Sequence, residues 1–357
     1  MSKFLVHEWH PEFAGVAGGI ESFVREMIEF RSNQDVTFLN SNYSGEWNGI
    51  NCVKIPLKVP GINLPNSLKF ALGLSKYLAF EKPSGEFILH RLEYVLLVRL
   101  FAPRASIFLF LHTDAQLLTG KNSDSKWRFA PFIYKVIQSL ALRFSTIVFV
   151  LNPRTFDYVS GLSGSLTIQI PGSFHPIFQL GSSVSDFKKT GVVWIGRLET
   201  VKNPILACKI LNQLSETMPT LLIGRGSLAD ECKKVLRQEV SRIAECGSRQ
   251  ELASILATKK YLIMTSHFEG APKVFLEALA AGCVVIATKE SDTENHVDFL
   301  KNHIRIVPDE VEAFITAMSN LEQRGYIPLS QCELNYLANR SSSSVMRDIW
   351  ARIELKS

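Results

Sequence analysis

The chain alternates short apolar runs with segments of helical periodicity over almost its whole length, and this alternation limits the folds that it can adopt. Seven strand-like runs lie in the first half and five in the second, and helical patterns fill most of the gaps. Strands that alternate with helices form parallel sheets with helices packed against them. Two such series in a chain of 357 residues predict an α/β protein of two doubly wound domains.

The expected elements place the domain boundary at a cluster of turn-forming residues that begins at Pro171-Gly172-Ser173. The domains are therefore expected at residues 1–172 and 173–335, with a closing segment, 336–357, that carries one more helical pattern. The strands of the first half are expected at Lys3–Glu8, Val36–Asn40, Cys52–Ile55, Glu86–His90, Ser106–Leu111, Thr146–Leu151 and Ser165–Ile170. Those of the second half are expected at Gly191–Ile195, Thr220–Ile223, Leu262–Thr265, Val284–Ala287 and Ile304–Val307. The main helical patterns of the first half are Ile20–Phe30, Ser67–Phe80, Leu92–Phe101 and Lys126–Phe144.

Composition is that of a soluble globular protein, with 46% hydrophobic and 20% charged residues. No secretory signal is recognisable, and no apolar run reaches the roughly 20 residues that span a bilayer. The six cysteines are scattered without a Cys-x-x-Cys pair, which favours reduced thiols in the cytoplasm and argues against a zinc site.

Positive charge is concentrated in the first half. Residues 1–172 hold 17 Lys and Arg against 13 Asp and Glu, and the remaining residues hold 22 against 21. An excess of this size suits an anionic membrane surface or a phosphorylated acceptor. It is too small to indicate nucleic acid as a partner, and no nucleic-acid recognition motif is present.

Two carboxylates, Glu269 and Glu277, stand eight residues apart across a strand–turn–helix junction. Gly270 begins the turn, Pro272 suits the first helical position, and Gly282 ends the helix. The unpaired N–H groups at the helix start would bind an anion or sugar oxygens. The alternative is that Glu269 is an ordinary loop residue and Glu277 a solvated helix residue.

Two cations occupy a similar position at the start of the second half. Gly196 and Arg197 follow an apolar strand, and Lys202 precedes the next helix. Fixed cations at the carboxyl end of a parallel strand suit a diphosphate. Taken alone, they are equally compatible with solvated loop charges.

Both segments resemble retaining glycosyltransferases of family 4 (glycosyl transferases group 1), which have the GT-B fold. Residues 269–278 resemble the family's Glu-Gly-Phe-Pro…Glu-Ala signature, with Ala271 in place of the usual Phe and Lys273 in place of Asn or a small residue. Residues 196–202 resemble its Gly-Arg-Leu…Lys segment. The resemblance implies two Rossmann-like domains that face a cleft, and a C-terminal helix that crosses back to the first domain.

The resemblance also implies a role for each residue of the two motifs. Arg197 and Lys202 would clamp the donor diphosphate, Glu269 would face the donor sugar and Glu277 the ribose. The other expected donor-binding residues are Gly18, Gly19, Gly196, Gly224, Gly270, Ala271, Pro272, Lys273 and Val274. The pair Gly18-Gly19 is also typical of a plain turn. The turn with which the family enters its second domain carries a carboxylate, and Pro171-Gly172-Ser173-Phe174-His175 does not.

Two histidines close strands of the first half. His112 follows Ser106–Leu111, with Asp114 nearby, and resembles the family's cleft histidine near the reacting sugar; His90 is placed similarly. These three residues are assigned to the acceptor side, and His112 is expected to be catalytic. A structural role is the alternative for each histidine. The three are also compatible with metal ligation, although the family needs neither metal nor cofactor, and none is expected here.

The segment Lys126–Phe144 mixes basic residues with aromatic and aliphatic ones at helical spacing. This pattern is typical of a helix that lies on an anionic membrane. It is equally that of a core-facing helix with a basic outer face.

Together these features predict a retaining glycosyltransferase with His112, Glu269, Arg197 and Lys202 as its catalytic residues. It would move a sugar from a nucleotide-diphosphate sugar to a hydroxyl of a glycan or lipid-linked glycan, in cell-envelope polysaccharide synthesis (lipopolysaccharide, O-antigen or capsule). It would be cytoplasmic or peripheral on the inner face of the cytoplasmic membrane. The alternatives are a GT-B nucleotide-sugar epimerase or phosphorylase, and a non-catalytic partner subunit.

Overall fold

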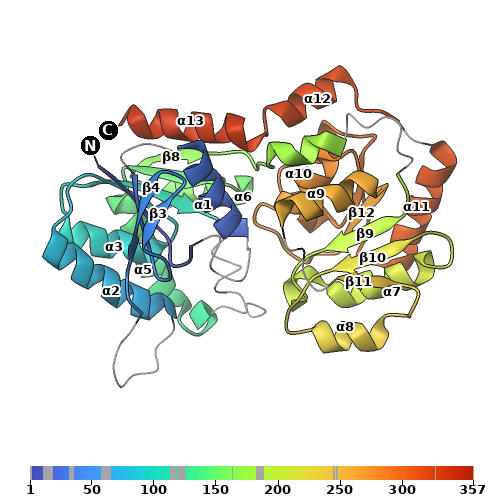
Figure 1. Cartoon of the computed structure of the whole chain (residues 1–357), viewed down its shortest axis with the longest axis horizontal. Coiled ribbons are helices and arrows are strands. Elements are labelled where there is room, and N and C mark those ends of the chain that lie inside the picture. The colour runs from blue at the N-terminus through green and yellow to red at the C-terminus, as the bar shows by residue number, and fades with distance from the viewer. Residues whose placement is uncertain are drawn as a thin grey trace. The chain divides into compact units, whose positions relative to one another are not determined.

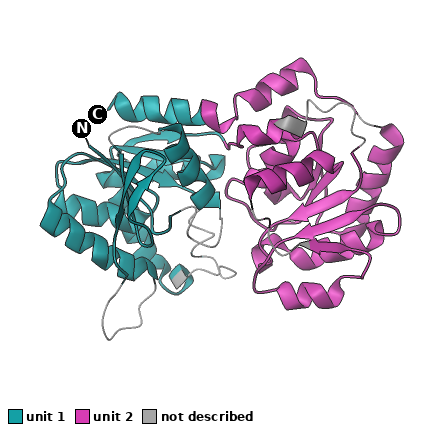
Figure 2. Cartoon of the chain, viewed as in Figure 1, with its two compact units in different colours: residues 1–171, 345–357 teal, residues 172–344 magenta. Residues whose placement is uncertain are grey.

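The chain divides into two compact units, one of residues 1–171 with 345–357 and the other of residues 172–344 (Figure 2). Both carry a sheet with helices packed against it (Figure 1). The structure, a computed structural model, describes residues 2–10, 19–31, 36–57, 66–112, 119, 126–162, 164–181, 189–243, 246, 248–325 and 327–356.

The first unit is built, within these ranges, on an eight-stranded sheet in the order β3-β4-β2-β1-β5-β6-β7-β8. All neighbouring strands are parallel except β3 and β4. The strands are β1 Lys3–Val6, β2 Val36–Asn40, β3 Gly45–Trp47, β4 Ile50–Lys54, β5 Glu86–Leu89, β6 Ser106–Leu111, β7 Ile147–Val150 and β8 Leu166–Gln169. The helices are α1 Gly19–Phe30, α2 Asn66–Glu81, α3 Leu92–Phe101, α5 Pro131–Phe144, α6 Pro153–Leu162 and α13 Ser342–Glu354, of which α13 lies in this unit from Val345 on.

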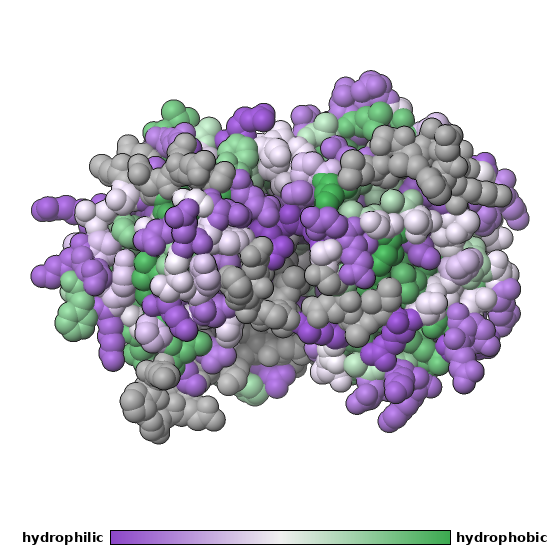
Figure 3. Space-filling model, in the orientation of Figure 1, coloured by the Kyte–Doolittle hydropathy of each residue, from purple (hydrophilic) through white to green (hydrophobic). Residues whose placement is uncertain are grey.

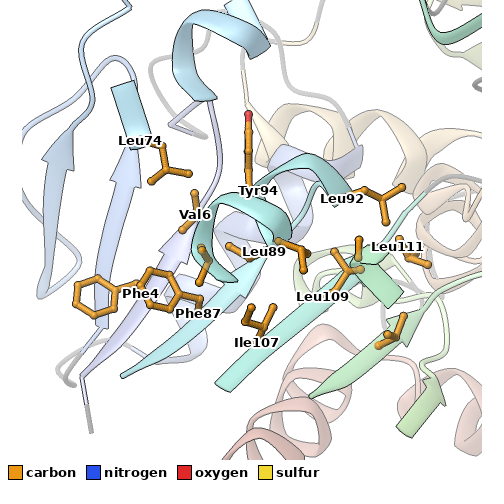
Figure 4. Packing of buried hydrophobic residues seen from close by; sticks show 14 of the residues in the cluster. Phe4, Val6, Leu74, Phe87, Leu89, Leu92, Tyr94, Ile107, Leu109 and Leu111 are labelled. Carbon is orange, nitrogen blue, oxygen red and sulfur yellow. The ribbon is translucent and has the colours of Figure 1, made fainter. Parts of the chain in front are cut away.

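Side chains of β1, β5 and β6 alternate between two buried faces of this sheet, as period-2 strands require. On one face they pack against α2 and α3, as Figure 4 shows for residues such as Phe4, Phe87 and Leu74. The rings of Phe4 and Phe87 stack at 5.0 Å. Their strand neighbours Leu5 and Ile88 are fully buried as well. Burial on both faces explains why these strands are apolar throughout.

The second unit has a six-stranded parallel sheet in the order β11-β10-β9-β12-β13-β14, counted over the described residues. Its strands are β9 Val192–Ile195, β10 Thr220–Ile223, β11 Ser241–Ile243, β12 Tyr261–Met264, β13 Val284–Ala287 and β14 Ile304–Ile306. Its helices are α7 Pro204–Leu214, α8 Ala229–Val235, α9 Arg249–Thr258, α10 Lys273–Ala280, α11 Val311–Arg324 and α12 Gln331–Ala338. One face of the sheet packs against α9, α10 and α12, and the other against α7, α8 and α11.

All twelve expected strands are present, but the structure also contains β3 and β11, which the sequence did not indicate. Both are three-residue strands at the edge of a sheet. β3 begins at Gly45 and has two exposed residues, and β11 contains Ser241 and Arg242. Strands that bury so little apolar surface leave no hydrophobic run to detect.

The expected continuous helix Lys126–Phe144 is wrong. A 3-10 turn covers Lys126–Phe129, and α5 begins separately at Pro131. Ala130, the residue before the proline, has φ −139° and interrupts the helix. The physical reason is that proline disfavours a helical residue before it and is best placed in the first helical turn.

The closing segment was expected to begin at residue 336, but residues 336–344 group with the second unit. Leu337 of α12 lies in the core of that unit, and Phe174 forms a parallel bridge with Ser341. Of the closing segment, only residues 345–357 belong to the first unit. There the Arg31 guanidinium lies 4.9 Å from the ring centre of Trp350.

Candidate functional site

The second unit changes its direction of winding between β9 and β12. The chain passes from β9 outward to β10 and β11, and then returns to β12 on the other side of β9. Loops that follow two such strands diverge and leave a crevice at the carboxyl edge of the sheet, where α/β proteins bind ligands. Gly196 and Arg197 follow β9, and Ser266 and Glu269 follow β12. The two predicted motifs therefore meet at this edge.

Hydrogen bonds join the loops that follow these two strands. The Thr265 hydroxyl donates to the carbonyls of Lys202 and Asn203, each at 2.9 Å. The His267 amide donates to the Val201 carbonyl at 3.0 Å. From below, the Trp194 indole donates to the Thr265 hydroxyl at 3.1 Å. The crevice thus has a fixed floor.

Lys202 and Glu269 form an ion pair on this floor. The Lys202 Nζ lies 2.6 Å from both carboxylate oxygens of Glu269, and the Ser266 hydroxyl donates to Oε1 at 2.7 Å. The Glu269 side chain is 6% exposed and that of Lys202 is 22% exposed. Glu269 is therefore no ordinary solvated loop residue. Arg197 is exposed, and within the described ranges its guanidinium makes no hydrogen bond or ion pair, although its carbonyl accepts a hydrogen bond from the Glu199 amide at 2.8 Å.

The glycines beside this pair are required by close backbone contacts. A Cβ on Gly224 would lie 2.0 Å from the Gly196 carbonyl oxygen, and a Cβ on Gly226 would lie 2.5 Å from that of Leu198. The loop after β10 therefore packs on the loop after β9 without intervening side chains. Gly196 and Gly224, both expected at the donor site, are adjacent in space.

Helix α10 starts next to Glu269, as expected, but one residue later than predicted. Pro272 is the N-cap, with φ −74° and ψ 103°, and Lys273 is the first helical residue. Gly270, Ala271 and Val274 are partly exposed at this helix start. Glu277 is 8% exposed, so it is not a solvated helix residue. After the helix, Gly282 has φ +79°, which confirms the predicted stop.

A polar hollow lies at the same edge of the sheet, beyond β12. Its walls come from the residues that follow three neighbouring strands. These are Ser266 and His267 after β12, Thr288, Lys289 and Glu290 after β13, and Ile306, Val307, Pro308 and Asp309 at and after the end of β14. The hollow lies at the carboxyl ends of β12, β13 and β14, and it includes Ser266, which also bonds to Glu269.

The first unit has its own change of winding direction, between β1 and β5. His7 and Glu8 follow β1, and His90 follows β5. His112 follows β6, the next strand along. The carboxyl edge of this sheet therefore gathers three histidines. The sequence predicts His90 and His112 at the ends of strands and at the acceptor side, whereas it indicates His7 only as part of the strand Lys3–Glu8.

The three histidines form a cluster in which His7 and His90 are buried and His112 is partly exposed. Nδ1 of His90 lies 2.8 Å from Nε2 of His112, and the His7 and His90 rings meet edge to face at 5.9 Å. Burial, with smaller contributions from the neighbouring His112 and His7, lowers the pKa of His90 well below its usual value. His90 is therefore neutral at physiological pH.

A second buried network lies beside the histidines and was missed from the sequence. The Glu8 carboxylate, on a residue that is 3% exposed, accepts hydrogen bonds from Arg91 at 2.9 Å and from the Tyr94 hydroxyl at 2.8 Å. Burial and the adjacent Glu8 raise the pKa of Tyr94 well above its usual value. Sequence position could have indicated this network, because Glu8 follows β1 and Arg91 follows β5, the two strands between which the winding direction changes.

Two expected site residues, Gly18 and Asp114, lie outside the described residues. Gly19 opens α1, one residue before the expected helical pattern, and among the described residues no atom lies within 4 Å of a Cβ placed on it. Where the structure describes the chain, no group of three His, Cys, Asp or Glu side chains is placed to hold a metal ion. In the same ranges, no helix is both long enough and apolar enough to cross a bilayer.

The surface of α5 is unusual because its exposed side is apolar. Phe129, in the preceding 3-10 turn, and Phe132 are 76% and 77% exposed, and Ile133 is 56% exposed. The inward side carries Tyr134, Gln138, Ala141 and Leu142. We call the exposed residues the α5 ridge, defined as Phe129, Phe132, Ile133, Val136, Leu140 and Phe144. Figure 3 shows hydrophobic side chains at several other places on a mostly hydrophilic surface.

Known proteins resemble this chain in fold and, over part of its length, in sequence. Residues 189–324 match the family model of glycosyl transferases group 1. Sucrose-phosphate synthase from Thermosynechococcus elongatus superposes with a TM-score of 0.78 at 14% identity, over 100% of both chains. Anabaena HepE in complex with UDP and glucose superposes with a TM-score of 0.75 at 14% sequence identity, over 99% of both chains. The lipopolysaccharide outer core galactosyltransferase WaaB superposes with a TM-score of 0.66 at 15% sequence identity, over 100% of both chains. No curated protein sequence matches significantly.

These likenesses confirm the predicted GT-B fold of two parallel-sheet α/β domains. The family match covers most of the second unit, which contains both sequence motifs, and none of the first.

Proposed function

We propose that the protein is a retaining glycosyltransferase that takes a sugar from a nucleoside-diphosphate sugar and transfers it to a hydroxyl of a glycan or lipid-linked glycan. The observation that carries this proposal is the cluster of Arg197, Lys202 and Glu269 at the change of winding in the second unit. The family match over the same unit supports it. HepE, a protein of the same fold, is described with UDP-glucose.

In this proposal the donor diphosphate binds beside Arg197 and Lys202. The Lys202 ammonium has three N–H donors, and Glu269 supplies one carboxylate, so a donor remains for a phosphate oxygen. The amides at the start of α10 add a partial positive charge. These groups stabilise the negative charge that grows on the diphosphate as its bond to the anomeric carbon breaks.

The acceptor oxygen then forms the new bond on the same face of the sugar, and its proton passes to the leaving diphosphate oxygen. Glu269 is assigned a positioning role in this step. Its carboxylate is already engaged by Lys202 and Ser266, which suits a group that orients sugar hydroxyls better than a nucleophile. His112, on the first unit, is assigned to the acceptor side.

A screen of nucleotide sugars for slow hydrolysis by the purified protein tests this proposal without knowledge of the acceptor. One donor should be hydrolysed well above the others, with nucleoside diphosphate as a product, and Arg197→Ala should abolish the difference. If the sugar is converted to its epimer and stays on the nucleotide, the protein is an epimerase. If no donor is bound or hydrolysed, a non-catalytic subunit is the better description.

We propose further that the first unit meets its acceptor at an anionic membrane, through the α5 ridge. Residues 126–144 contain four basic residues and no acidic one, and Arg128, Lys135 and Arg143 are exposed beside the ridge. A helix with apolar and basic exposed residues binds an anionic bilayer surface. Trp127 packs against the core of the first unit. Phe129 and Phe132 are therefore the aromatic residues that we expect to insert into the membrane.

Sedimentation with vesicles that contain anionic lipid tests this surface. Each basic residue near such a surface contributes about 1 kcal/mol, so Arg128, Lys135 and Arg143 changed together to Glu should abolish binding. The control changes Lys209, Lys233 and Lys234, exposed on α7 and α8, to Glu and alters net charge equally. If both variants lose binding equally, or neither does, the ridge is not a membrane contact and a soluble acceptor is favoured.

A further inference from the structure

The polar hollow at the ends of β12, β13 and β14 is a feature that the proposed reaction does not use. Its volume is about 530 Å³, within the range of about 300–1,000 Å³ that is typical of sites for small molecules. Residues that follow three neighbouring parallel strands line it, and this edge of a sheet is where α/β proteins bind ligands. Size and position therefore both suit a binding site.

Hydrogen bonds hold the floor of the hollow in place. The Thr288 amide donates to the Met264 carbonyl at 3.0 Å, and the Val307 amide donates to the Ala287 carbonyl at 2.9 Å. These bonds continue the ladders of the sheet beyond the ends of its strands. The Thr288 hydroxyl donates to the Ser266 carbonyl at 2.7 Å. A ligand would meet a floor that is already formed, which lowers the entropy lost on binding.

The rim of the hollow carries charged groups of both signs. Lys289 is exposed and Glu290 is partly exposed, and within the described residues neither the ammonium nor the carboxylate makes a hydrogen bond or an ion pair. Oδ2 of Asp309 is 3.9 Å from Nδ1 of His267, which is beyond hydrogen-bond distance, and these side chains are 59% and 51% exposed. The rim therefore offers a ligand both hydrogen-bond donors and acceptors.

This mixture of groups discriminates between classes of ligand. The carboxylates of Glu290 and Asp309 disfavour a phosphate or another anion, and the Lys289 ammonium disfavours a metal ion. A sugar hydroxyl both donates and accepts hydrogen bonds, so it suits an ammonium and a carboxylate alike. The C–H face of a sugar ring suits apolar surface. The apolar residues that line the hollow are Ile306, Val307 and Pro308.

Ser266 connects the hollow with the predicted donor site. It lines the hollow, and its hydroxyl donates to Glu269, which also pairs with Lys202. Along the sheet, β9 with its two cations is followed by β12, β13 and β14. The hollow therefore lies on the side of β12 away from the expected diphosphate, and a sugar in it would lie next to the sugar expected at Glu269.

We propose that the hollow is a second sugar site, which binds an uncharged sugar residue beside the reacting sugar. The residue belongs either to the chain of the glycan acceptor or to a free sugar. Its place beside a reacting sugar rests on the proposed function. Its binding rests on the hollow of the second unit alone.

Amide NMR of the full-length protein tests the site without knowledge of the donor. The titrants are glucose, galactose and mannose, then maltotriose, galactotriose and mannotriose, with glucuronic acid as the charged control. At least one neutral sugar should shift the signals of Lys289 and Glu290 saturably and leave that of Gly196, at the donor site, unchanged. Glucuronic acid should bind more weakly. A trisaccharide that binds more tightly than its monosaccharide indicates a glycan chain, and equal affinities indicate a free sugar.

Two charge-matched double variants test the rim. Lys289→Ala/Asp309→Ala removes a donor and an acceptor, and a lost hydrogen bond to a charged group raises Kd at least about tenfold. The control, Lys301→Ala/Asp298→Ala, changes exposed residues of the same unit outside the hollow and should leave Kd unchanged.

Three results would overturn the inference: no neutral sugar shifts the signals of the hollow, both double variants lose affinity equally, or glucuronic acid binds most tightly. The proposed function can fail separately. If a neutral sugar binds here while no nucleotide sugar is bound or hydrolysed, the proposed function fails and the sugar site stands. If a nucleotide sugar is hydrolysed and no neutral sugar binds, only the second site is wrong.

Discussion

The ion pair between Lys202 and Glu269 offers a sharp test of the donor site, because its burial predicts an energetic cost that a surface pair does not have. Lys202→Met removes the cation and leaves a carboxylate on a side chain that is 6% exposed, where the Ser266 hydroxyl still donates a hydrogen bond to it. Removal of one partner from a buried pair costs about 3–5 kcal/mol. Since the Lys202 side chain is 22% exposed, we expect the lower end, about 3 kcal/mol.

The second unit also contains the matched control. Lys260 contacts both carboxylate oxygens of Glu322 at 2.9 Å, but the Glu322 side chain is 44% exposed. Such exposed pairs contribute about 0.2–1 kcal/mol to the free energy of unfolding. Lys260→Met should therefore lower this free energy by less than about 1 kcal/mol. In the double variant Lys202→Met/Glu269→Gln the buried charge is gone. A coupling energy of about 2 kcal/mol is therefore expected for the buried pair.

Chemical denaturation followed by fluorine NMR of fluorotryptophan measures these costs in the second unit alone. Trp194 is the single tryptophan among residues 172–344, and its indole bonds to the floor of the site. A probe confined to one unit avoids the error of treating a two-domain protein as two-state. Equal losses for Lys202→Met and Lys260→Met would refute the reasoning, because burial would then play no part.

Three further outcomes follow from the structure. Gly224→Ala should destabilise the second unit by about 1–3 kcal/mol and abolish nucleoside-diphosphate binding in calorimetry, because its Cβ would lie 2.0 Å from a backbone oxygen; normal binding would contradict this. Arg197→Ala should weaken the same binding about 10- to 150-fold with stability unchanged, since it removes a charge-assisted contact; equal affinities would remove Arg197 from the clamp. Burial lowers the pKa of His296 from 6.5 to about 3. Between these two pH values the unfolded state therefore binds more protons than the folded state. The contribution of His296 to stability is complete above pH 6.5 and is lost at up to about 1.4 kcal/mol per pH unit as the pH falls. His296→Gln should remove this component from unfolding curves between pH 7 and 5, and unchanged curves would disprove it.

The strands were predictable because both faces of both sheets are covered. Strands such as β12, Tyr261–Met264, are buried at every position, and such strands stand out as apolar runs bounded by turns. The positions of Gly196 and Glu269 followed from the same strands, since each residue lies just after a carboxyl end. The strands and the residues at their carboxyl ends could therefore be predicted from short stretches of sequence.

The pairing of Lys202 with Glu269 could not be predicted, because the two residues are 67 positions apart. Their motifs indicate a diphosphate contact for Lys202 and a sugar contact for Glu269. Each of these predictions uses only the residues next to it in the sequence. Their contact depends on sheet order, which places β9 beside β12 although two strands intervene in sequence. The same reason explains why His7 was not grouped with His90.

Helix α5 shows a different limit. Its periodicity correctly indicated two faces, but periodicity alone does not say which face is buried. The structure turns Tyr134, Gln138 and Leu142 inward and leaves Phe132 and Ile133 exposed. Apolar residues therefore lie on both sides of the helix. The exposed apolar face therefore became visible only with the packing of the unit.

The two units share one architecture, so the division of labour between them must come from side chains. Each sheet changes its winding direction once, and the residues after the two strands at that point are brought together. In the second unit these include two cations, Arg197 and Lys202, which suit a dianionic leaving group. In the first unit they include the neutral His90 and a Glu8 that is already bonded, which suit hydroxyl groups. In the proposed function, charge at equivalent positions, and not the fold, is the reason to place the donor at the second unit and the acceptor at the first.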